Sequence, residues 1–365
     1  MKDKIFQKVH PVKYREAVIS AKPKLFDRVK EELLEVQKEV LLKNYSTYRI
    51  GGPAKYFFVV KSKNDLISAL KTAKKFKLPV FILGGGSNLL ISDKGFNGLA
   101  IKISILDVKF EDNKAFVGAG TNLIKLAYLS ADKGLSGFEW AAGIPGTVGG
   151  AVHGNAHAFG TKISDLVKEV QTLNLKNLKF KNFTKKQCCF SLKNSIFKKN
   201  KNLVIVSAVL EFKKQDTEQI KNRIKEFLKH RVAKHPMNFP SAGSTFVNPV
   251  VKIYPVKYRK AVISALPKLF DRMKNKKFIN KYPELEGYIK KGVIPSGYLI
   301  EKCGLAGRRI GNAQISEKHC NFIINLGGAK SKDVLSLMDL AKKNVKENFG
   351  VSLEPEIQLV GFSKK

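Results

Sequence analysis

Apolar residues recur at helical and strand-like spacings along most of the chain, and these spacings predict alternating helices and strands. Between residues 64 and 77 the apolar positions lie three or four apart, which places them on one face of a helix. Residues 56–60 before this helix read as a strand, and LPVFILGGGSNLLI (78–91) after it reads as a strand, a glycine turn and a second strand. Such alternation is typical of α/β or α+β units.

Further elements are predicted by the same spacings. Residues 31–43 are expected to form a helix that leads into the ordered core, and residues 167–214 alternate like strands around a basic loop. Residues 218–230 have helical spacing, and 275–293 form a lysine-rich, helix-like linker. The tail from Lys332 predicts an amphipathic helix that ends at Gly350.

One segment occurs twice. Residues 10–30 return at 254–274 with 17 of 21 residues identical, too far apart to be the tandem units of a solenoid. Each copy holds a helix-compatible stretch, Tyr14 to Ala21 and Tyr258 to Ala265, followed by a proline. A partner-binding helix is one interpretation. We favour the other, a tolerated surface insertion that carries no chemistry.

The net charge is the most unusual property of the composition. The 365-residue chain has 67 Lys and Arg against 30 Asp and Glu, a net charge of +37. A field of this sign attracts polyanions and anionic small molecules. The lysines are nevertheless spread in short clusters, and no recognition-helix, RNP or zinc-finger pattern accompanies them. We therefore expect anionic small-molecule ligands and no specific nucleic acid.

Other features exclude several classes of protein. No apolar run reaches about 18 residues and the N-terminus lacks an apolar signal core, so we expect a cytoplasmic protein with no membrane partner. The four cysteines have no zinc spacing and are expected to be reduced thiols. The six histidines form no HxxH or HExxH pattern, so no metal site is expected. The sequence indicates no oligomeric state.

Three glycine-rich segments point to a ligand. Residues 84–88 leave a strand with successive backbone N–H groups, which suits an anion nest. Residues 118–122 begin like a dinucleotide fingerprint, but Leu123 stands where the third glycine belongs. Residues 137–165 combine seven glycines with little charge, which lets the backbone approach a flat or phosphorylated group closely. Together they predict a shared ligand, held by neither a Rossmann fold nor a P-loop.

Several ordered motifs resemble those of the UDP-N-acetylenolpyruvoylglucosamine reductase family. They are RIGGPA (49–54), ILGGGSNLLI (82–91), GIPGTVGGAV (143–152) with Asn155, PSAGSTFVNP (240–249), residues 296–325 and LEPEIQLVG (353–361). The resemblance covers most of residues 44–249 and 295–362 and leaves out the repeated segments.

The resemblance implies an α+β fold with two domains. A vanillyl-alcohol-oxidase-type (PCMH-type) FAD-binding domain, residues 44–215, would precede an α+β substrate-binding domain, residues 216–365. Residues 1–43 would be an N-terminal extension with the first repeat copy, and about 250–294 an insertion with the second. The implied reaction has two stages, in which NADPH reduces FAD and the reduced flavin reduces UDP-N-acetylglucosamine enolpyruvate to UDP-N-acetylmuramate, a peptidoglycan precursor.

The resemblance also implies the site residues. Those for FAD are Arg49, Gly84, Gly85, Gly86, Ser87, Asn88, Gly143, Ile144, Pro145, Gly146, Thr147, Gly149, Gly150 and Asn155. Ser244 corresponds to the proton-donating serine, and Glu356 to the carboxylate that holds or protonates the developing enol. Nearness to the serine motif suggests Asn248 and Arg231 as substrate contacts.

The sequence departs from the family pattern at four positions. Leu192 and Lys193 replace a tyrosine and an arginine, and Lys193 is the candidate for the third catalytic role. Lysine keeps the charge but lacks the planar fork that grips a carboxylate, so we expect weaker activity. Val247 stands where lysine is common, and His157 stands where glycine is common, beside the expected flavin.

Alternatives stay open at this point. A flavin oxidase of another sugar or alcohol shares the expected fold, although Ser244, Glu356 and the C-terminal motifs favour the reductase. A weakly active or catalytically silent flavin-binding homologue is favoured by Leu192, Lys193 and Val247. A polyanion-binding protein is favoured only by the net charge.

Overall fold

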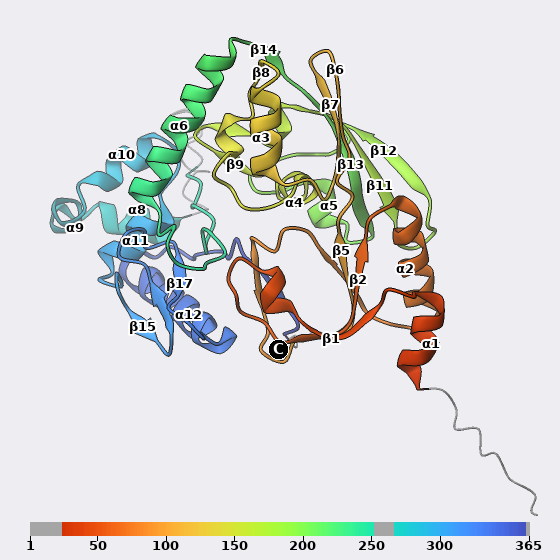
Figure 1. The fold of residues 1–365 in the computed structure, drawn as a ribbon. Coiled ribbons are helices and arrows are strands. Elements are labelled where there is room, and N and C mark those ends of the chain that lie inside the picture. Colours follow the sequence, from red (N-terminus) through yellow and green to blue (C-terminus); the bar gives the residue numbers. More distant parts are fainter. Residues whose placement is uncertain (1–23, 252–265, 363–365) are drawn as a thin grey trace, which may run out of the picture.

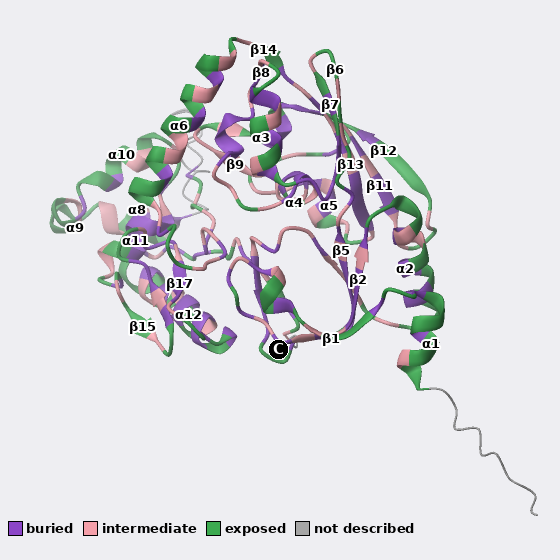
Figure 2. Ribbon diagram, viewed as in Figure 1, coloured by how far each residue is buried: buried purple, intermediate pink, exposed green. Residues whose placement is uncertain are grey.

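The computed structural model describes residues 24–251 and 266–362 (Figure 1). An N-terminal part built on two β-sheets lies beside a smaller, mainly helical C-terminal part. Buried residues follow the strands of both sheets and the inner faces of the helices (Figure 2). No helix in these ranges is long and apolar enough to cross a membrane.

The first sheet has the strand order β1-β2-β5-β3. Its strands are β1 (Gln37–Leu41), β2 (Pro53–Val60), β5 (Phe96–Ile103) and β3 (Val80–Leu83). The last three are parallel, and β1 joins β2 antiparallel at the edge. Helices α1 (Leu25–Glu32) and α2 (Lys63–Lys75) lie on its outer side (Figure 1), and Ser62 with Asp65 forms a capping box that starts α2.

The second sheet is antiparallel, in the order β12-β11-β13-β7-β6. Its strands are β12 (Phe180–Thr184), β11 (Val167–Asn174), β13 (Leu203–Glu211), β7 (Lys114–Gly118) and β6 (Val108–Glu111). Helix α4 (Val148–Gly154) packs on β13, with α3 (Leu123–Ala131), α5 (Ile196–Lys199) and α6 (Thr217–Lys234) nearby (Figure 1). One apolar core unites residues of both sheets, so these two sheets form a single structural unit.

The C-terminal part has its own core around α12 (Ser331–Phe349). It contains α8 (Pro267–Met273), α9 (Lys276–Lys281), α10 (Glu284–Lys290), α11 (Ser296–Lys302) and the antiparallel strands β15 (Arg309–Ile310), β16 (Ala313–Ile315) and β17 (Ile323–Asn325). Gly350, at φ 70°, ends α12 in the left-handed conformation. The chain then returns to the N-terminal part, where β18 (Gln358–Val360) pairs parallel with β4 (Leu89–Ile91).

Short elements complete the fold. They are β8 (Leu135–Ser136), β9 (His157–Ala158), β10 (Thr161–Lys162), β14 (Lys213–Lys214) and the 3-10 helices η1 (Leu42–Tyr45), η2 (Glu139–Ala141) and η3 (Ile163–Asp165).

Most predicted elements are confirmed, and one is wrong. The helices expected at 64–77, 218–230 and in the tail are α2, α6 and α12, and the lysine-rich linker holds α9 and α10. The helix expected over 31–43 is incorrect, because α1 ends at Glu32 and residues 37–41 form strand β1. Pairing with the open edge of β2 overrides the helical preference of this Glu- and Lys-rich segment.

The repeated segment is only partly described. Its helix-compatible stretches, Tyr14 to Ala21 and Tyr258 to Ala265, lie outside the described residues. The shared Leu-Phe-Asp-Arg sequence forms part of α1 in the first copy and of α8 in the second. Leu25 is 38% exposed, whereas its counterpart Leu269 is fully buried. The interpretation of the second copy as a surface insertion is therefore wrong for α8, which contributes to the C-terminal core.

Candidate active site

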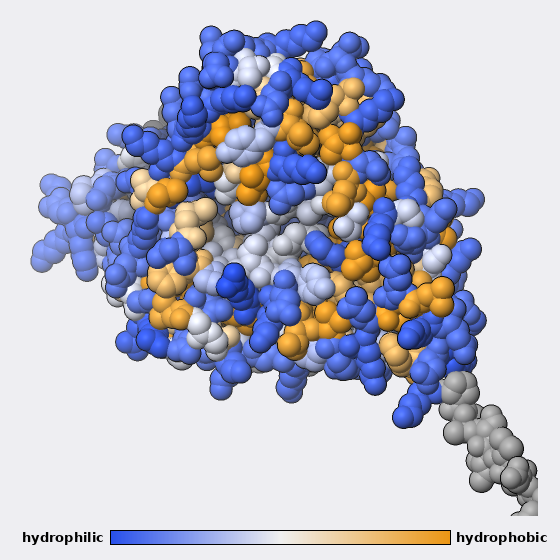
Figure 3. Space-filling view, viewed as in Figure 1, coloured by the Kyte–Doolittle hydropathy of each residue, from blue (hydrophilic) through white to orange (hydrophobic). Residues whose placement is uncertain are grey.

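A cavity of about 1310 Å³ opens between the two parts of the molecule. Figure 3 shows it as a hollow floored by residues of intermediate hydropathy and ringed by apolar and polar side chains. Its wall brings together residues 84–88, 143–147, 149–150 and 235–244 with Lys193 and Glu356. The cavity therefore combines nearly all the candidate residues from distant parts of the sequence.

Two glycine loops form one wall of this cavity by direct apposition. A Cβ on Gly85 would lie 2.5 Å from Gly146 Cα, and one on Gly84 would lie 2.9 Å from Thr147 Oγ1. Gly146 adopts φ 146°, which an L side chain disfavours. These glycines are needed for the loops to meet, so the loops jointly present backbone to the cavity.

The third glycine segment supports the second loop from behind. Leu123 N donates to Gly146 O at 3.1 Å, and Gly149 N donates to Ala119 O at 2.9 Å. Residues 118–123 thus hold the 143–150 loop in place. The three segments converge, as their closeness in the sequence suggested.

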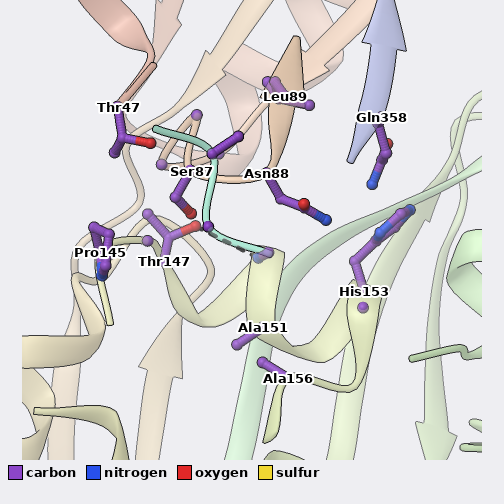
Figure 4. A pocket seen from close by; sticks show the side chains of 18 of the residues that line it. Thr47, Ser87, Asn88, Leu89, Pro145, Thr147, Ala151, His153, Ala156 and Gln358 are labelled. Carbon is purple, nitrogen blue, oxygen red and sulfur yellow. Dashed lines mark hydrogen bonds between the residues drawn. The ribbon is translucent and has the colours of Figure 1, made fainter. Parts of the chain in front are cut away.

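Asn88 links the first glycine loop to the C-terminal strand. Its Nδ2 donates to the Glu356 carbonyl at 3.2 Å, and its own carbonyl accepts from Gln358 N at 3.0 Å. Figure 4 shows the side chains of Asn88, Gln358 and His153 pointing into a common space, with Ser87 and Thr147 beside it. The position of Glu356 is therefore tied directly to the glycine loop.

Ser244 and Glu356 lie on adjacent backbone segments. Glu356 N donates to Thr245 O at 2.8 Å, Val247 N donates to Glu354 O at 2.9 Å, and Phe246 bridges antiparallel to Pro355. Ser244 and Glu356 both line the cavity, whereas Glu354 is exposed. The pairing brings the two catalytic candidates to one wall.

Lys193 lies in the loop between β12 and α5, and its side chain reaches Glu356 at the cavity wall. Its Nζ lies 2.6 Å from Glu356 Oε1, and the two side chains are only 23% and 14% exposed. Lys193 adopts φ 52°, and its carbonyl accepts a hydrogen bond from Lys198 Nζ at 3.0 Å. The loop that carries it is further held because Ser195 Oγ donates to His153 O at 2.7 Å.

Two candidates do not line the cavity. Asn155 is buried as the left-handed C-cap of α4, and its Nδ2 donates to Ser191 O at 2.8 Å. It thereby positions the loop that carries Lys193. The exposed Asn248 accepts a hydrogen bond from Ser296 N at 2.9 Å and so holds the start of α11. Both amides therefore support neighbouring segments of the fold.

Positions that depart from the family pattern occupy different environments. Leu192 is 50% exposed. Val247 does not line the cavity, and its N–H donates a hydrogen bond to Glu354 O. His157 lines the cavity, where burial and then the charge of Lys193 lower its pKa. His157 is therefore disfavoured as a cation beside Lys193.

His153 and Gln358 are cavity residues that the sequence did not single out. Burial, followed by the charge of Lys198, lowers the pKa of His153 to about 4, so the imidazole is neutral at pH 7. A histidine within a glycine-rich segment was the available signal for His153. Gln358 gave no signal, because its place depends on β18 pairing with β4.

The architecture accommodates a dinucleotide cofactor. The two glycine loops, which an added Cβ would push apart, line the cavity, and its lining also includes the apolar residues Phe81, Phe96 and Leu203. FAD has both a phosphorylated and an apolar, planar section. The described residues hold no cluster of three or more His, Cys, Asp or Glu that could bind a metal.

Comparison with known proteins agrees with this site. Residues 54–177 match the FAD binding domain family, and residues 235–360 match the family described as UDP-N-acetylenolpyruvoylglucosamine reductase, C-terminal domain. UDP-N-acetylenolpyruvoylglucosamine reductase of Anoxybacillus flavithermus is 35% identical over 92% of this chain and 99% of its own length. That of Caldanaerobacter subterraneus is 36% identical over 92% and 98%. The crystal structure of the reductase from Thermus caldophilus has a TM-score of 0.66 and 30% identity, covering 89% of this chain and 98% of that one.

Fold and site therefore define an FAD-dependent oxidoreductase, with a PCMH-type FAD-binding domain and an α+β C-terminal domain. The chain belongs to the UDP-N-acetylenolpyruvoylglucosamine reductase family, whose members are enzymes of peptidoglycan synthesis. The fold class, the cofactor and the enzyme class expected from the sequence are confirmed.

Proposed function

We propose that this enzyme uses NADPH to reduce UDP-N-acetylglucosamine enolpyruvate to UDP-N-acetylmuramate, with Ser244, Glu356 and Lys193 acting on the substrate. The observation that carries the proposal is that all three line the cavity side by side: Lys193 Nζ contacts Glu356 Oε1 at 2.6 Å, and Glu356 N donates at 2.8 Å to the carbonyl of Thr245, the residue after Ser244. The substrate class is supported by the names of the relatives, which are UDP-N-acetylenolpyruvoylglucosamine reductases.

FAD, when bound, supplies the hydride chemistry by accepting a hydride from NADPH and passing it to the enolpyruvyl double bond. The residues along the two glycine loops would hold it, from Arg49 and 84–88 on one side to 143–150 on the other. Asn155 contributes by positioning the Lys193 loop through Ser191. The remaining chemistry belongs to side chains that handle charge and protons.

Lys193 is the residue suited to the substrate carboxylate. An ammonium group has three N–H donors, and contact with Glu356 accounts for one of them. The others can bind the carboxylate, next to which negative charge develops when hydride reaches the double bond. A positive charge held there favours the charged transition state over the neutral alkene.

Ser244 is the residue suited to protonate the neighbouring carbon. A serine hydroxyl is a weak acid and needs a charged partner to give up its proton and regain it. Glu356 and Lys193 supply opposite charges on the same wall of the cavity. We assign Glu356 two roles: as a carboxylate it keeps Lys193 in place, and as a carboxylic acid it would donate a hydrogen bond to the developing enol.

The cellular role follows from the reaction. A soluble UDP-sugar and NADPH are substrates found in the cytoplasm, so we place the enzyme there, in cell-wall biogenesis and thus in cell shape and division. The net charge of +37 favours attraction of these anionic substrates.

The test uses purified full-length protein. Its visible spectrum is recorded, and NADPH oxidation is followed with and without UDP-N-acetylglucosamine enolpyruvate. We expect a yellow protein whose NADPH consumption depends on this substrate. A yellow protein reduced by NADPH but never reoxidised by the substrate would support the catalytically silent homologue instead. Reduction of the flavin by another sugar or alcohol, followed by reoxidation by oxygen, would support the oxidase.

A further inference from the structure

Arg231, in the last turn of α6, is a buried cation on the cavity wall. Its side chain is only 8% exposed, and it lines the cavity together with the 143–147 loop. Burying a charge is costly unless the charge is paired and hydrogen-bonded. The groups around Arg231 therefore indicate which kind of ligand group would pair with it.

The guanidinium has few partners within the protein. Its Nη2 donates to Trp140 O at 3.2 Å, and its Nε has no hydrogen-bond partner among the described residues. None of the ion pairs among the described residues involves Arg231, and burial lowers the pKa of Arg231. A guanidinium carries five N–H donors, so most of its donors are unused.

Its neighbours add positive rather than negative charge. His235, at the end of α6, also lines the cavity, and burial together with His319, Arg231, His230 and Lys318 lowers the pKa of His235 to about 4. Every group in this set is cationic or neutral. The Arg231 guanidinium thus has no anionic partner among the described residues, and a ligand in the cavity is the available source of one.

The packing of Arg231 indicates which ligand it meets. A Cβ on Gly143 would lie 2.5 Å from Arg231 Cδ, so the side chain rests on the first residue of the GIPG loop. Its guanidinium also lies 5.1 Å from the centre of the Phe159 ring. Both contacts are with the segment matched to the FAD binding domain, whereas neither matched region includes residue 231.

We propose that Arg231 is a cofactor residue, whose guanidinium binds a negatively charged oxygen of FAD from the α6 side. This inference rests on the proposed function and replaces substrate contact, which the sequence suggested, as the role of Arg231. The anionic oxygen belongs either to the pyrophosphate or to the reduced flavin ring.

The experiment compares wild-type protein with Arg231→Met, which keeps an apolar stem, Arg231→Lys, which keeps the charge, and Lys229→Met. The last removes one exposed charge from the same helix and is the matched control. For each apoprotein, FAD and ADP dissociation constants are measured by titration. For each reconstituted protein at saturating FAD, the midpoint potential of the flavin and the KM for the enolpyruvyl substrate are measured.

We expect Arg231→Met to bind FAD at least tenfold more weakly or to lower its midpoint potential, with Arg231→Lys intermediate and Lys229→Met unchanged. A parallel loss of ADP affinity assigns the pyrophosphate, and a lower potential with unchanged ADP affinity assigns the reduced ring. If Arg231→Met does not fold, Arg231→Lys alone must still show the loss. Unchanged FAD affinity and potential, with or without a higher substrate KM, would overturn the inference. A wild-type chain that binds no FAD would instead overturn the proposed function.

Discussion

Lys193 Nζ lies 2.6 Å from Glu356 Oε1, although one residue belongs to the loop before α5 and the other to the segment before β18. Both side chains are largely buried at the cavity wall. Lys193, at a position where the resemblance implies an arginine, thus forms a direct ion pair with the candidate catalytic carboxylate. In the proposed function, its one ammonium group serves both Glu356 and the substrate.

Lys193→Arg is therefore expected to raise kcat/KM severalfold. A guanidinium can bind the substrate carboxylate with two parallel hydrogen bonds, a gain of about 1 kcal/mol over an ammonium. Lys193→Met is expected to lower kcat/KM by roughly 100-fold, because it also leaves Glu356 buried without a partner. Steady-state rates with NADPH and the enolpyruvyl substrate measure both. An arginine variant no faster than wild type would show that lysine suffices here.

Gly85→Ala is expected to abolish tight FAD binding and to lower the thermal unfolding temperature. The new Cβ would lie 2.5 Å from Gly146 Cα, so the two loops would have to separate. Gly287→Ala in α10 is the control, because its Cβ would meet no atom within 4 Å and alanine favours a helix. Flavin titration and thermal melts of both variants test this. Retained FAD affinity in Gly85→Ala would contradict the close apposition of the loops.

The motif resemblance predicted the fold class, and the helical spacing of apolar residues predicted α2, α6 and α12. The sequence-based prediction failed at 31–43, where pairing with β2 decides the structure. It placed Ser244 and Glu356 by motif, but their adjacency depends on hydrogen bonds between 245–247 and 354–356 that no spacing reveals. Similarly, no local pattern indicates that Asn155 and Asn248 support neighbouring segments or that Gln358 enters the cavity.

The duplicated segment offers a matched pair of substitutions. Leu25 and Leu269 occupy the same place in the two copies, but the first is 38% exposed and the second fully buried in the C-terminal core. Leu269→Ala is expected to lower the free energy of unfolding by about 2 to 4 kcal/mol, and Leu25→Ala by less than about 1. Urea unfolding measures both. Equal effects would contradict the different burial of the copies.

Acid is expected to destabilise the fold through His153. Burial lowers its folded-state pKa to about 4, whereas the unfolded value is near 6.5. Between these values the unfolded chain binds a proton that the folded chain does not, so stability is full above pH 6.5 and falls as the pH approaches 4. His153→Gln should reduce this fall by about 2 kcal/mol. Urea unfolding at pH 7, 5.5 and 4.5 measures it, and an unchanged slope would contradict the neutral buried imidazole.

The central claim is that Ser244 and Glu356 serve the substrate half of the reaction and not the reduction of the flavin. The most direct measurement follows flavin absorbance near 450 nm without oxygen, first on adding one equivalent of NADPH and then on adding the enolpyruvyl substrate. In Ser244→Ala and Glu356→Gln we expect bleaching by NADPH within about twofold of the wild-type rate and reoxidation slowed by roughly 1000-fold or more. Reoxidation at the wild-type rate in both variants would contradict the account.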